Sequence, residues 1–347
     1  MTTDELQAAR LLLSRLGLRA EDLLSDAAAN NKPTPTFADY IRRLQSACPP
    51  GTLRTYAPYW SRIASSWGDR PITDPSALEI REMIEQCKRD AIVRRNSRGG
   101  RSAAEHMVGA LRALYRQAEA DGYLTAANNP ANHIVKPRRL PSNRHALSNN
   151  LLADITRVIT TTGNDPDLDT LILRLHIETA CRRGGALSLR PCDLDPEQCL
   201  IKLREKGETV RWQPVSPSLM HALLRHVERG SARDGQLLRY RNGRPITGRR
   251  YDYIWNRVGK HLPWAATQQI TAHWLRHTTL TWVERHHGYA VARAFAGHND
   301  GGASNAGATL TYVRASLHEV AEALTAMTGE PHPLVTESDS GIRPMAA

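Results

Sequence analysis

Two arginines, two histidines and a tyrosine occur in the chain in an order suited to phosphoryl transfer: Arg182, His273, Arg276, His298 and Tyr312. The transition state of that reaction carries negative charge on non-bridging oxygens, which arginine can bind bidentately. Beside two fixed cations a phenolate is favoured, so that Tyr312 can act as the nucleophile. The set predicts cleavage of a phosphodiester without a metal, through a covalent phosphotyrosyl intermediate.

The remaining chemical roles fall on residues around these five. Lys206, in the turn Arg204-Glu205-Lys206-Gly207-Glu208, has the reach to protonate the leaving 5′ oxygen, and burial would lower its pKa. His273 and His298 would move protons or donate to phosphate oxygens. Arg183 is the alternative to Arg182, Lys202 is the alternative to Lys206, and His277 is assigned an orienting or capping role.

Composition favours a polyanionic partner. The 347 residues are enough for two domains, and 46 Lys and Arg against 35 Asp and Glu give a net charge of +11. The five cysteines include no Cys-x-x-Cys pair, which argues against disulfides and zinc and fits a reducing cytoplasm. The sequence shows no leader and no apolar run of membrane-spanning length, so we expect a soluble cytoplasmic protein without membrane contact.

The first half of the chain predicts a small helical domain over residues 36–135, after an appendage of residues 1–35. Thr36, with Asp39 three residues later, is typical of a helix start. Apolar residues then recur at helical spacing in stretches beginning near Phe37, Leu53, Leu78 and Met107, and Gly122 ends the last of them.

Two basic segments of this half are predicted to contact a nucleic-acid backbone. The first is a glycine-containing loop that carries Arg94, Arg95, Arg98 and Arg101. The second, residues 136–147, contains Lys136, Arg138 and Arg139 and is held extended by its prolines, as a linker between domains would be. A solvated loop is the alternative interpretation of the first segment.

The second half, residues 148–328, has a mixed pattern, followed by a tail of residues 329–347. Helices are expected over 151–160 and 171–179, short strands over 200–203 and 210–215, and further helices from Met220 onward. The chain is therefore predicted to be mainly α-helical with one small antiparallel sheet, whose turn presents Lys206.

The ordered set of motifs resembles that of the tyrosine recombinases, the phage-integrase type of site-specific recombinase. His273-x-x-Arg276-His277-Thr278 is similar to the second box of that family, and Gly297-His298 followed by Tyr312 is similar to its third. Arg182 falls where the first family arginine falls, and Lys206-Gly207 resembles the hairpin of the catalytic lysine. The resemblance covers about residues 36 to 328 and depends on the order of the boxes.

The resemblance implies a helical core-binding domain and an α+β catalytic domain that clamp double-stranded DNA. It further implies a homotetramer that exchanges strands through a Holliday junction, without cofactor or metal, and with possible accessory DNA-bending proteins. The apolar helix that begins at Leu317 would dock between subunits. Integration or excision of a mobile element is the expected role, and the protein would be nucleoid-associated when bound to DNA. Relaxation of DNA by a type IB topoisomerase-like enzyme and a DNA-binding protein with an impaired site are the alternatives.

The sequence departs from the family pattern at two points. The family usually has an acidic residue three positions after the first arginine, but this chain has Gly185 there. The segment between His298 and Tyr312 is also longer than usual and rich in glycine. We therefore expect another residue to orient Arg182, and the tyrosine to be carried on a longer segment.

Overall fold

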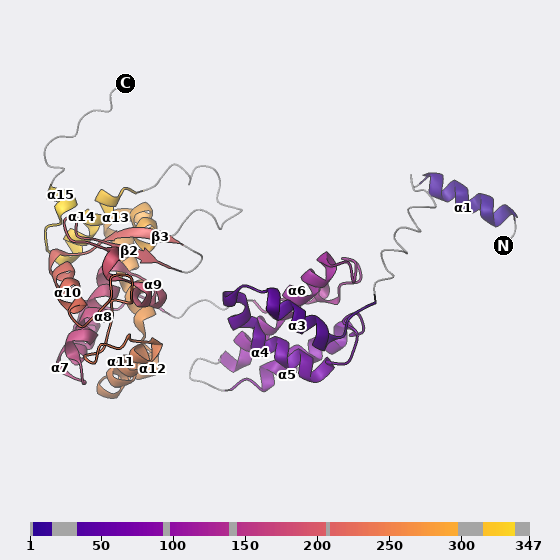
Figure 1. Cartoon of the computed structure of the whole chain (residues 1–347), viewed down its shortest axis with the longest axis horizontal. Coiled ribbons are helices and arrows are strands. Elements are labelled where there is room, and N and C mark those ends of the chain that lie inside the picture. Colours follow the sequence, from indigo (N-terminus) through magenta and orange to yellow (C-terminus); the bar gives the residue numbers. More distant parts are fainter. Residues whose placement is uncertain are drawn as a thin grey trace, which may run out of the picture. The chain divides into compact units, whose positions relative to one another are not determined.

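The computed structural model describes residues 3–15, 33–92, 98–138, 144–205, 209–297 and 315–336 (Figure 1). The chain divides into two compact units, Met1–Pro141 and Ser142–Ala347. This division falls inside the segment 136–147 that was predicted as a linker. An N-terminal helix, α1 (Thr3–Arg15), leaves Leu11 and Leu12 each 62% exposed.

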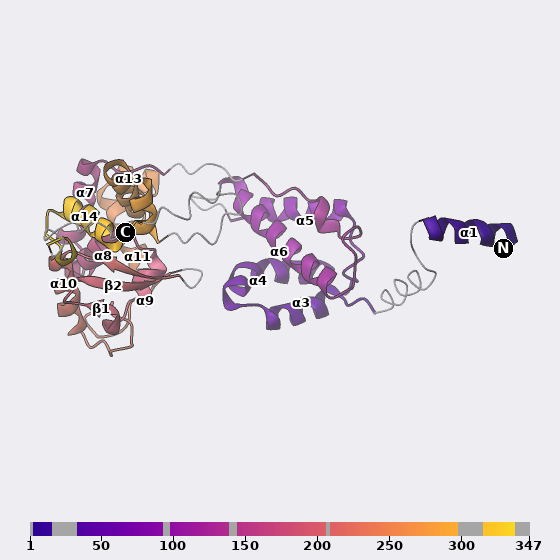
Figure 2. The same ribbon diagram turned by 90° about the horizontal axis from the view of Figure 1, so that it is seen from above.

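The first unit is built from helices packed around one apolar core (Figures 1 and 2). Its main elements are α3 (Phe37–Ala47), α4 (Pro50–Trp67), α5 (Ala77–Arg89), η1 (Arg98–Gly100), α6 (Arg101–Ala120) and η2 (Pro130–His133). The Thr36 side chain accepts a hydrogen bond from the Asp39 N–H at 3.3 Å, so the predicted helix start is observed. Trp60 is fully buried, and its indole N–H donates to the Ala110 carbonyl at 3.0 Å, which joins α4 to α6.

A close backbone approach requires glycine at the start of α6. Gly99 and Gly100 have φ of 64° and 74°, which is the left-handed region. A Cβ at Gly100 would lie 2.1 Å from the Lys88 carbonyl oxygen, so no other residue fits there without movement of α5.

The second unit consists of a small sheet and the helices packed around it (Figures 1 and 2). Its helices are α7 (Asn149–Thr161), α8 (Pro166–Thr179), α9 (Arg183–Ser188), η3 (Pro191–Asp193), α10 (Pro217–Val227), α11 (Gly248–His261), α12 (Pro263–Gln268), α13 (Ala272–Ala296), α14 (Leu317–Thr328) and α15 (Pro333–Thr336). The strands are β1 (Leu194–Asp195), β2 (Leu200–Arg204) and β3 (Val210–Pro214), in the order β1-β2-β3.

The sheet is antiparallel throughout, and Leu203 of β2 pairs with Arg211 of β3. The prediction of a mainly helical chain with one small antiparallel sheet is therefore confirmed. Strand β1 was missed because its two residues are too few to give an alternating pattern.

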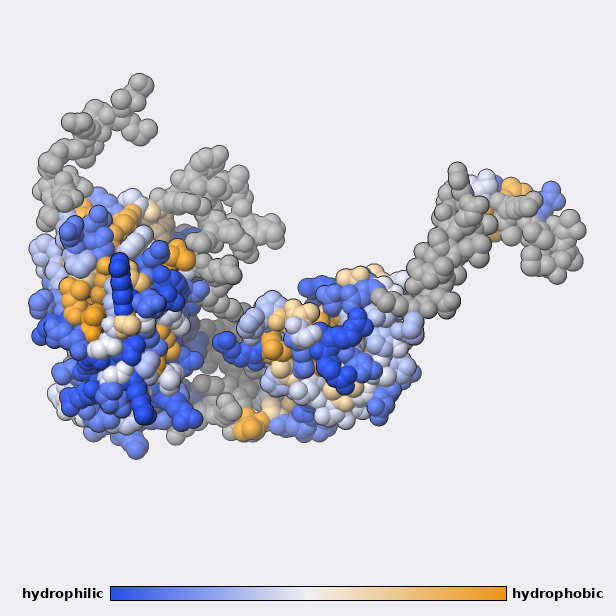
Figure 3. All heavy atoms as spheres, viewed as in Figure 1, coloured by the Kyte–Doolittle hydropathy of each residue, from blue (hydrophilic) through white to orange (hydrophobic). Residues whose placement is uncertain are grey.

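The visible surface of each unit is mostly hydrophilic, with hydrophobic residues in small separate groups (Figure 3). Within the described residues, no helix combines the length and the hydropathy needed to cross a membrane.

A buried ion-pair cluster fixes α8 against α11. Asp169 of α8 is fully buried, and its two carboxylate oxygens accept from Arg250 Nε and Arg257 Nη2, each at 2.7 Å. Arg250 and Arg257 are themselves 3% and 8% exposed. Two buried cations therefore depend on one carboxylate, and removal of one partner from such a cluster leaves charge uncompensated.

We predict that Asp169→Asn lowers the free energy of unfolding by about 3 to 5 kcal/mol, because both guanidinium groups lose their buried counter-charge. Urea unfolding followed by circular dichroism measures the change. The control is Asp167→Asn on the same helix, whose carboxylate is 84% exposed and for which we expect less than about 1 kcal/mol. Equal effects of the two variants would show that the cluster does not stabilise the unit.

Candidate functional site

The loop after α8 is held in one conformation before Arg182. Ala180 is fully buried and adopts a left-handed conformation with φ of 48°, which costs a non-glycine residue about 1 kcal/mol or more. The Cys181 N–H donates to Thr179 Oγ1 at 3.2 Å, and the Cys181 carbonyl lies 3.0 Å from His176 Nδ1. These contacts turn the chain so that α9 starts directly after Arg182.

Arg182 pairs with the carboxylate of Glu205, a residue that was not among those predicted for the site. Glu205 Oε1 accepts from the Arg182 backbone N–H at 2.6 Å, and Glu205 Oε2 accepts from Arg182 Nη1 at 2.7 Å. The Glu205 side chain is fully buried, whereas the Arg182 side chain is 36% exposed. Arg183 is exposed and lies beside Gly248, at the start of α11. Of the two adjacent arginines, only Arg182 is therefore observed to pair with Glu205.

Arg276 reaches the same carboxylate from α13. Its Nη1 lies 4.0 Å from Glu205 Oε1 and donates to the Ala180 carbonyl, while its Nη2 donates to the Ala296 carbonyl at 2.8 Å. The residue is 4% exposed. Arg276 thus joins the α8 loop to the C-terminal end of α13, and tertiary structure brings it together with Arg182.

A third arginine, Arg211 of β3, points into this cluster. Its Nη2 donates to the Thr179 carbonyl at 3.2 Å, and within the described residues its Nε and Nη1 are buried without a hydrogen-bond partner. Burial lowers the pKa of Arg211 to about 10, with Arg276 and Arg182 acting in the same direction and Glu205 opposing them. Gly297, at φ 64°, makes room for this side chain, because a Cβ there would lie 2.4 Å from Arg211 Nε.

His273 stands in the first turn of α13, one helical turn from Arg276. Its ring meets the His277 ring edge-on, with centroids 5.2 Å apart. The residue keeps considerable exposed surface, yet burial of part of its ring, the nearby cations Arg144, Arg276 and Arg182, and the His277 ring lower its pKa to about 4. His273 is therefore neutral at pH 7.

The other three predicted catalytic residues, Lys206, His298 and Tyr312, lie outside the described residues. Their chain neighbours are described. In the sequence, Lys206 directly follows Glu205 and His298 directly follows Gly297. Tyr312 lies between Gly297 and Ala315 in the sequence.

Of the predicted backbone-contacting residues, Arg94, Arg95, Arg139 and the Arg98 side chain also lie outside the described residues. Arg101 donates from Nε and Nη2 to the Arg138 carbonyl at 3.0 and 2.7 Å, which holds that segment against α6. Lys136 pairs with Glu105 at 3.3 Å, and Arg138 itself is exposed. Arg101 therefore has a structural role within the first unit.

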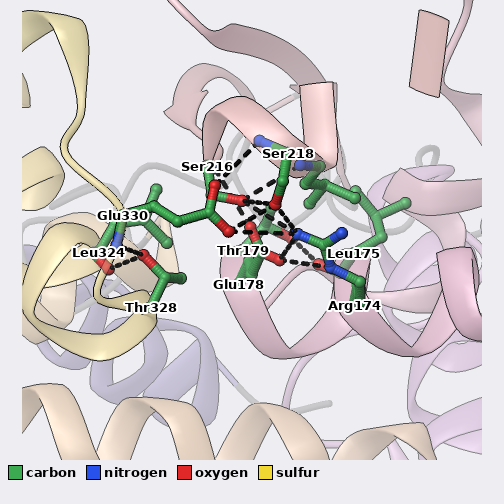
Figure 4. Close-up of polar contacts among 10 residues, drawn as sticks. Arg174, Leu175, Glu178, Thr179, Ser216, Ser218, Leu324, Thr328 and Glu330 are labelled. Carbon is green, nitrogen blue, oxygen red and sulfur yellow. Dashed lines mark hydrogen bonds and ion pairs between the residues drawn. The ribbon is translucent and has the colours of Figure 1, made fainter. Parts of the chain in front are cut away.

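A polar network fixes the chain after α14 to its own unit (Figure 4). Glu330 accepts from the Ser218 N–H at 3.0 Å and from its hydroxyl, and Arg174 donates to Ser218 Oγ at 2.6 Å. Arg174 also donates to Glu178 at 3.0 Å, and Glu178 accepts from the Ser216 N–H at 3.1 Å. The network ends at α8, directly before the loop that carries Arg182.

The apolar face of α14 is buried in the same unit. Val320, Ala323 and Leu324 pack with Phe295 and Val283 of α13. The helix predicted to dock between subunits therefore uses this face within its own chain. As for metal ligands, the part of the chain that the structure describes contains no group of three His, Cys, Asp or Glu residues arranged to hold an ion.

Comparison with curated protein sequences gave no match. Among solved structures, the chain is similar to a lambda integrase tetramer bound to a Holliday junction, with a TM-score of 0.60, 17% identity and 86% of each chain covered. It is also similar to the Tn1549 transposon integrase in complex with transposon right-end DNA, with a TM-score of 0.59, 18% identity, and 85% of this chain and 99% of that chain covered. These likenesses establish a shared fold.

The model of the phage integrase family matches residues 145–306. The matched segment includes all three arginines of the cluster, and Tyr312 lies just beyond it. Motif order, fold and family match agree over this segment, and residues 145–306 carry a domain of the phage integrase family.

Proposed function

We propose that the protein is a site-specific DNA recombinase that cleaves and rejoins strands through a 3′-phosphotyrosyl intermediate and a Holliday junction. The observation that carries the proposal is the convergence of Arg182 and Arg276 on one buried carboxylate, from segments far apart in the sequence. Two guanidinium groups fixed in this way can stabilise charge that develops on a phosphate. A guanidinium has five donors, so that it can hold main-chain carbonyls and also bind an oxyanion.

Each residue of the set has a proposed role. Tyr312 attacks the phosphate, Arg182 and Arg276 bind its non-bridging oxygens, and Lys206 protonates the leaving 5′ oxygen. His273 and His298 hydrogen-bond to the phosphate or move protons. Since His273 is neutral at pH 7, its imidazole has one N–H donor and one acceptor nitrogen. No nucleotide is required, because the phosphotyrosine conserves the energy of the broken bond.

We also propose that the two units clamp double-stranded DNA and that four copies assemble on two duplexes. Lambda integrase provides the analogy, as a tetramer on a Holliday junction and as a dimer on a core site. Contact through the C-terminal helix then requires α14 to leave its place on α13 or to use outward residues such as Leu317, which is 36% exposed. Integration or excision of a mobile element is the proposed biological role, and the transposon integrase among the similar structures supports it.

We predict that Tyr312→Phe abolishes covalent capture of DNA and leaves DNA affinity nearly unchanged, because only the nucleophilic oxygen is lost. A nicked suicide substrate, resolved on a denaturing gel, measures capture. The control is Tyr289→Phe, since Tyr289 is 57% exposed on α13 and should be dispensable. A covalent band that persists in Tyr312→Phe would assign the nucleophile to another residue. Absence of the band in the unmodified protein would favour a DNA-binding protein with an impaired site.

We predict that Arg144→Gln raises the pKa of His273 from about 4 toward the ordinary value near 6.5, because the loss of a neighbouring cation favours the protonated ring. A pH titration of the histidine ring signals by NMR measures this shift, with Arg157→Gln on α7 as a charge-matched control.

The corresponding stability effect has a defined sign. Because the folded pKa lies below the unfolded value, the contribution of His273 to stability is present above about pH 6.5 and is lost as the pH falls toward 4. Arg144→Gln should therefore reduce the loss of stability on acidification. An unchanged titration midpoint for His273 would contradict the electrostatic explanation.

We predict that neutralising Arg94, Arg95 and Arg98 together, by glutamine, flattens the dependence of DNA affinity on salt. Each phosphate contact contributes a slope of roughly 0.9 in log affinity against log salt concentration. Binding is measured by fluorescence anisotropy over a salt series. A triple variant of the exposed residues Arg42, Arg54 and Arg81 removes the same charge elsewhere on the first unit. Equal flattening in both variants would mean that net charge, and not this loop, determines the slope.

A further inference from the structure

The geometry points to Glu205 as the residue that positions Arg182, in place of the acidic side chain that this chain lacks at Gly185. The inference rests on the proposed function, because it concerns the same arginine pair. Glu205 would act through Arg182 and would not itself touch the phosphate, so it is a positioning residue.

The Glu205 side chain lies where a side chain at residue 185 would begin. A Cβ at the buried Gly185 would lie 3.1 Å from Glu205 Cγ and 3.3 Å from Glu205 Oε1, which is closer than ordinary van der Waals contact. A side chain at residue 185 and the observed side chain at residue 205 would therefore crowd each other. Glycine at residue 185 therefore leaves room for the observed position of the Glu205 carboxylate, which any larger residue there would have to shift by a few tenths of an ångström.

The Glu205 carboxylate accepts two hydrogen bonds from Arg182, one from its backbone and one from its side chain. One oxygen accepts from the Arg182 backbone N–H at 2.6 Å and the other from Nη1 at 2.7 Å. Because the Glu205 side chain is fully buried, water competes little for these bonds. The position of the Arg182 backbone and the direction of its guanidinium group are thus set by the same group.

Glu205 also supplies the negative charge of a cluster of three cations. Arg182, Arg211 and Arg276 repel one another, two of them are buried, and a nearby anion stabilises each of the three. Glu205 lies within 4.0 Å of Arg276 Nη1 and raises the pKa of both Arg276 and Arg211, against the lowering by burial. Glu205 therefore offsets part of the cost of burying these two cations.

The place of Glu205 in the chain gives it a further effect. Its backbone N–H donates to the Thr209 carbonyl at 2.8 Å, which closes the hairpin between β2 and β3. Lys206 is the next residue. One carboxylate therefore links the first arginine of the site to the base of the hairpin that carries the proposed general acid.

The inference is tested by removing the carboxylate at residue 205 and introducing one at residue 185. Single-turnover covalent capture on the nicked substrate, at saturating DNA, is measured for Glu205→Ala, Glu205→Gln and the double variant Glu205→Ala with Gly185→Asp. We expect Glu205→Ala to capture DNA about 100-fold more slowly with affinity little changed, as for other misplaced catalytic groups. The double variant should regain at least tenfold, since the carboxylate on residue 185 enters the vacated space.

The matched control is Glu205→Ala with Gly184→Asp. Gly184 is exposed and a Cβ there meets nothing within 4 Å, so this variant restores the charge one residue away but outside the shared space. It should not regain activity. Glu205→Gln keeps the size of the side chain and provides a folded comparison if Glu205→Ala is unstable. Capture by Glu205→Ala within threefold of the unmodified protein, or equal rates for the two double variants, would overturn the inference.

A second measurement does not depend on cleavage. The Arg182 guanidinium N–H signals, assigned by their loss in Arg182→Lys, should broaden by exchange in Glu205→Ala and sharpen again with Gly185→Asp. Unchanged signals in Glu205→Ala would overturn the role of Glu205 whether or not the protein cleaves DNA. Failure of the unmodified protein to capture DNA, together with the expected NMR changes, would instead refute the proposed function alone.

Discussion

The candidate site of the second unit depends on holding three guanidinium groups together, two of them, Arg211 and Arg276, largely shielded from water. Arg182, Arg211 and Arg276 carry like charges, so their approach is unfavourable unless anions and oriented carbonyls surround them. The structure supplies one buried carboxylate, Glu205, and the carbonyl groups of Thr179, Ala180 and Ala296. Such a cluster is preorganised to bind an anion, because the guanidinium groups are already positioned in the folded protein before a phosphate binds.

The elements around the cluster hold the three arginines close together despite their like charges. Helix α8 ends in a strained left-handed residue, Ala180, whose carbonyl is turned toward Arg276. The same helix is fixed by the buried Asp169 at its start and by Glu178 near its end. A strained backbone conformation persists only when the surrounding structure fixes it. Here α8, which precedes the strained residue, is fixed by ion pairs to α11 and by hydrogen bonds to the start of α10.

The network at Glu330 extends this arrangement to the C-terminal segment (Figure 4). Residues on both sides of the segment that contains Tyr312 belong to one unit, since α13 and α14 pack together. The polar contacts of Glu330 are made partly by exposed groups, so they cost less to break than the apolar contacts of Leu324 and Phe295.

The sequence by itself indicated most of the longer helices, the two longer strands and the resemblance to the tyrosine recombinases, because periodic apolar residues, caps and ordered motifs are local signals. It also showed that residue 185 lacks the usual acidic side chain. Only the tertiary structure decided that Glu205 occupies that space, that Arg211 joins the arginines, and that Arg101 is held by the Arg138 carbonyl. These contacts join separate elements at no fixed spacing in the sequence, and they depend on where helix, loop and strand meet in three dimensions.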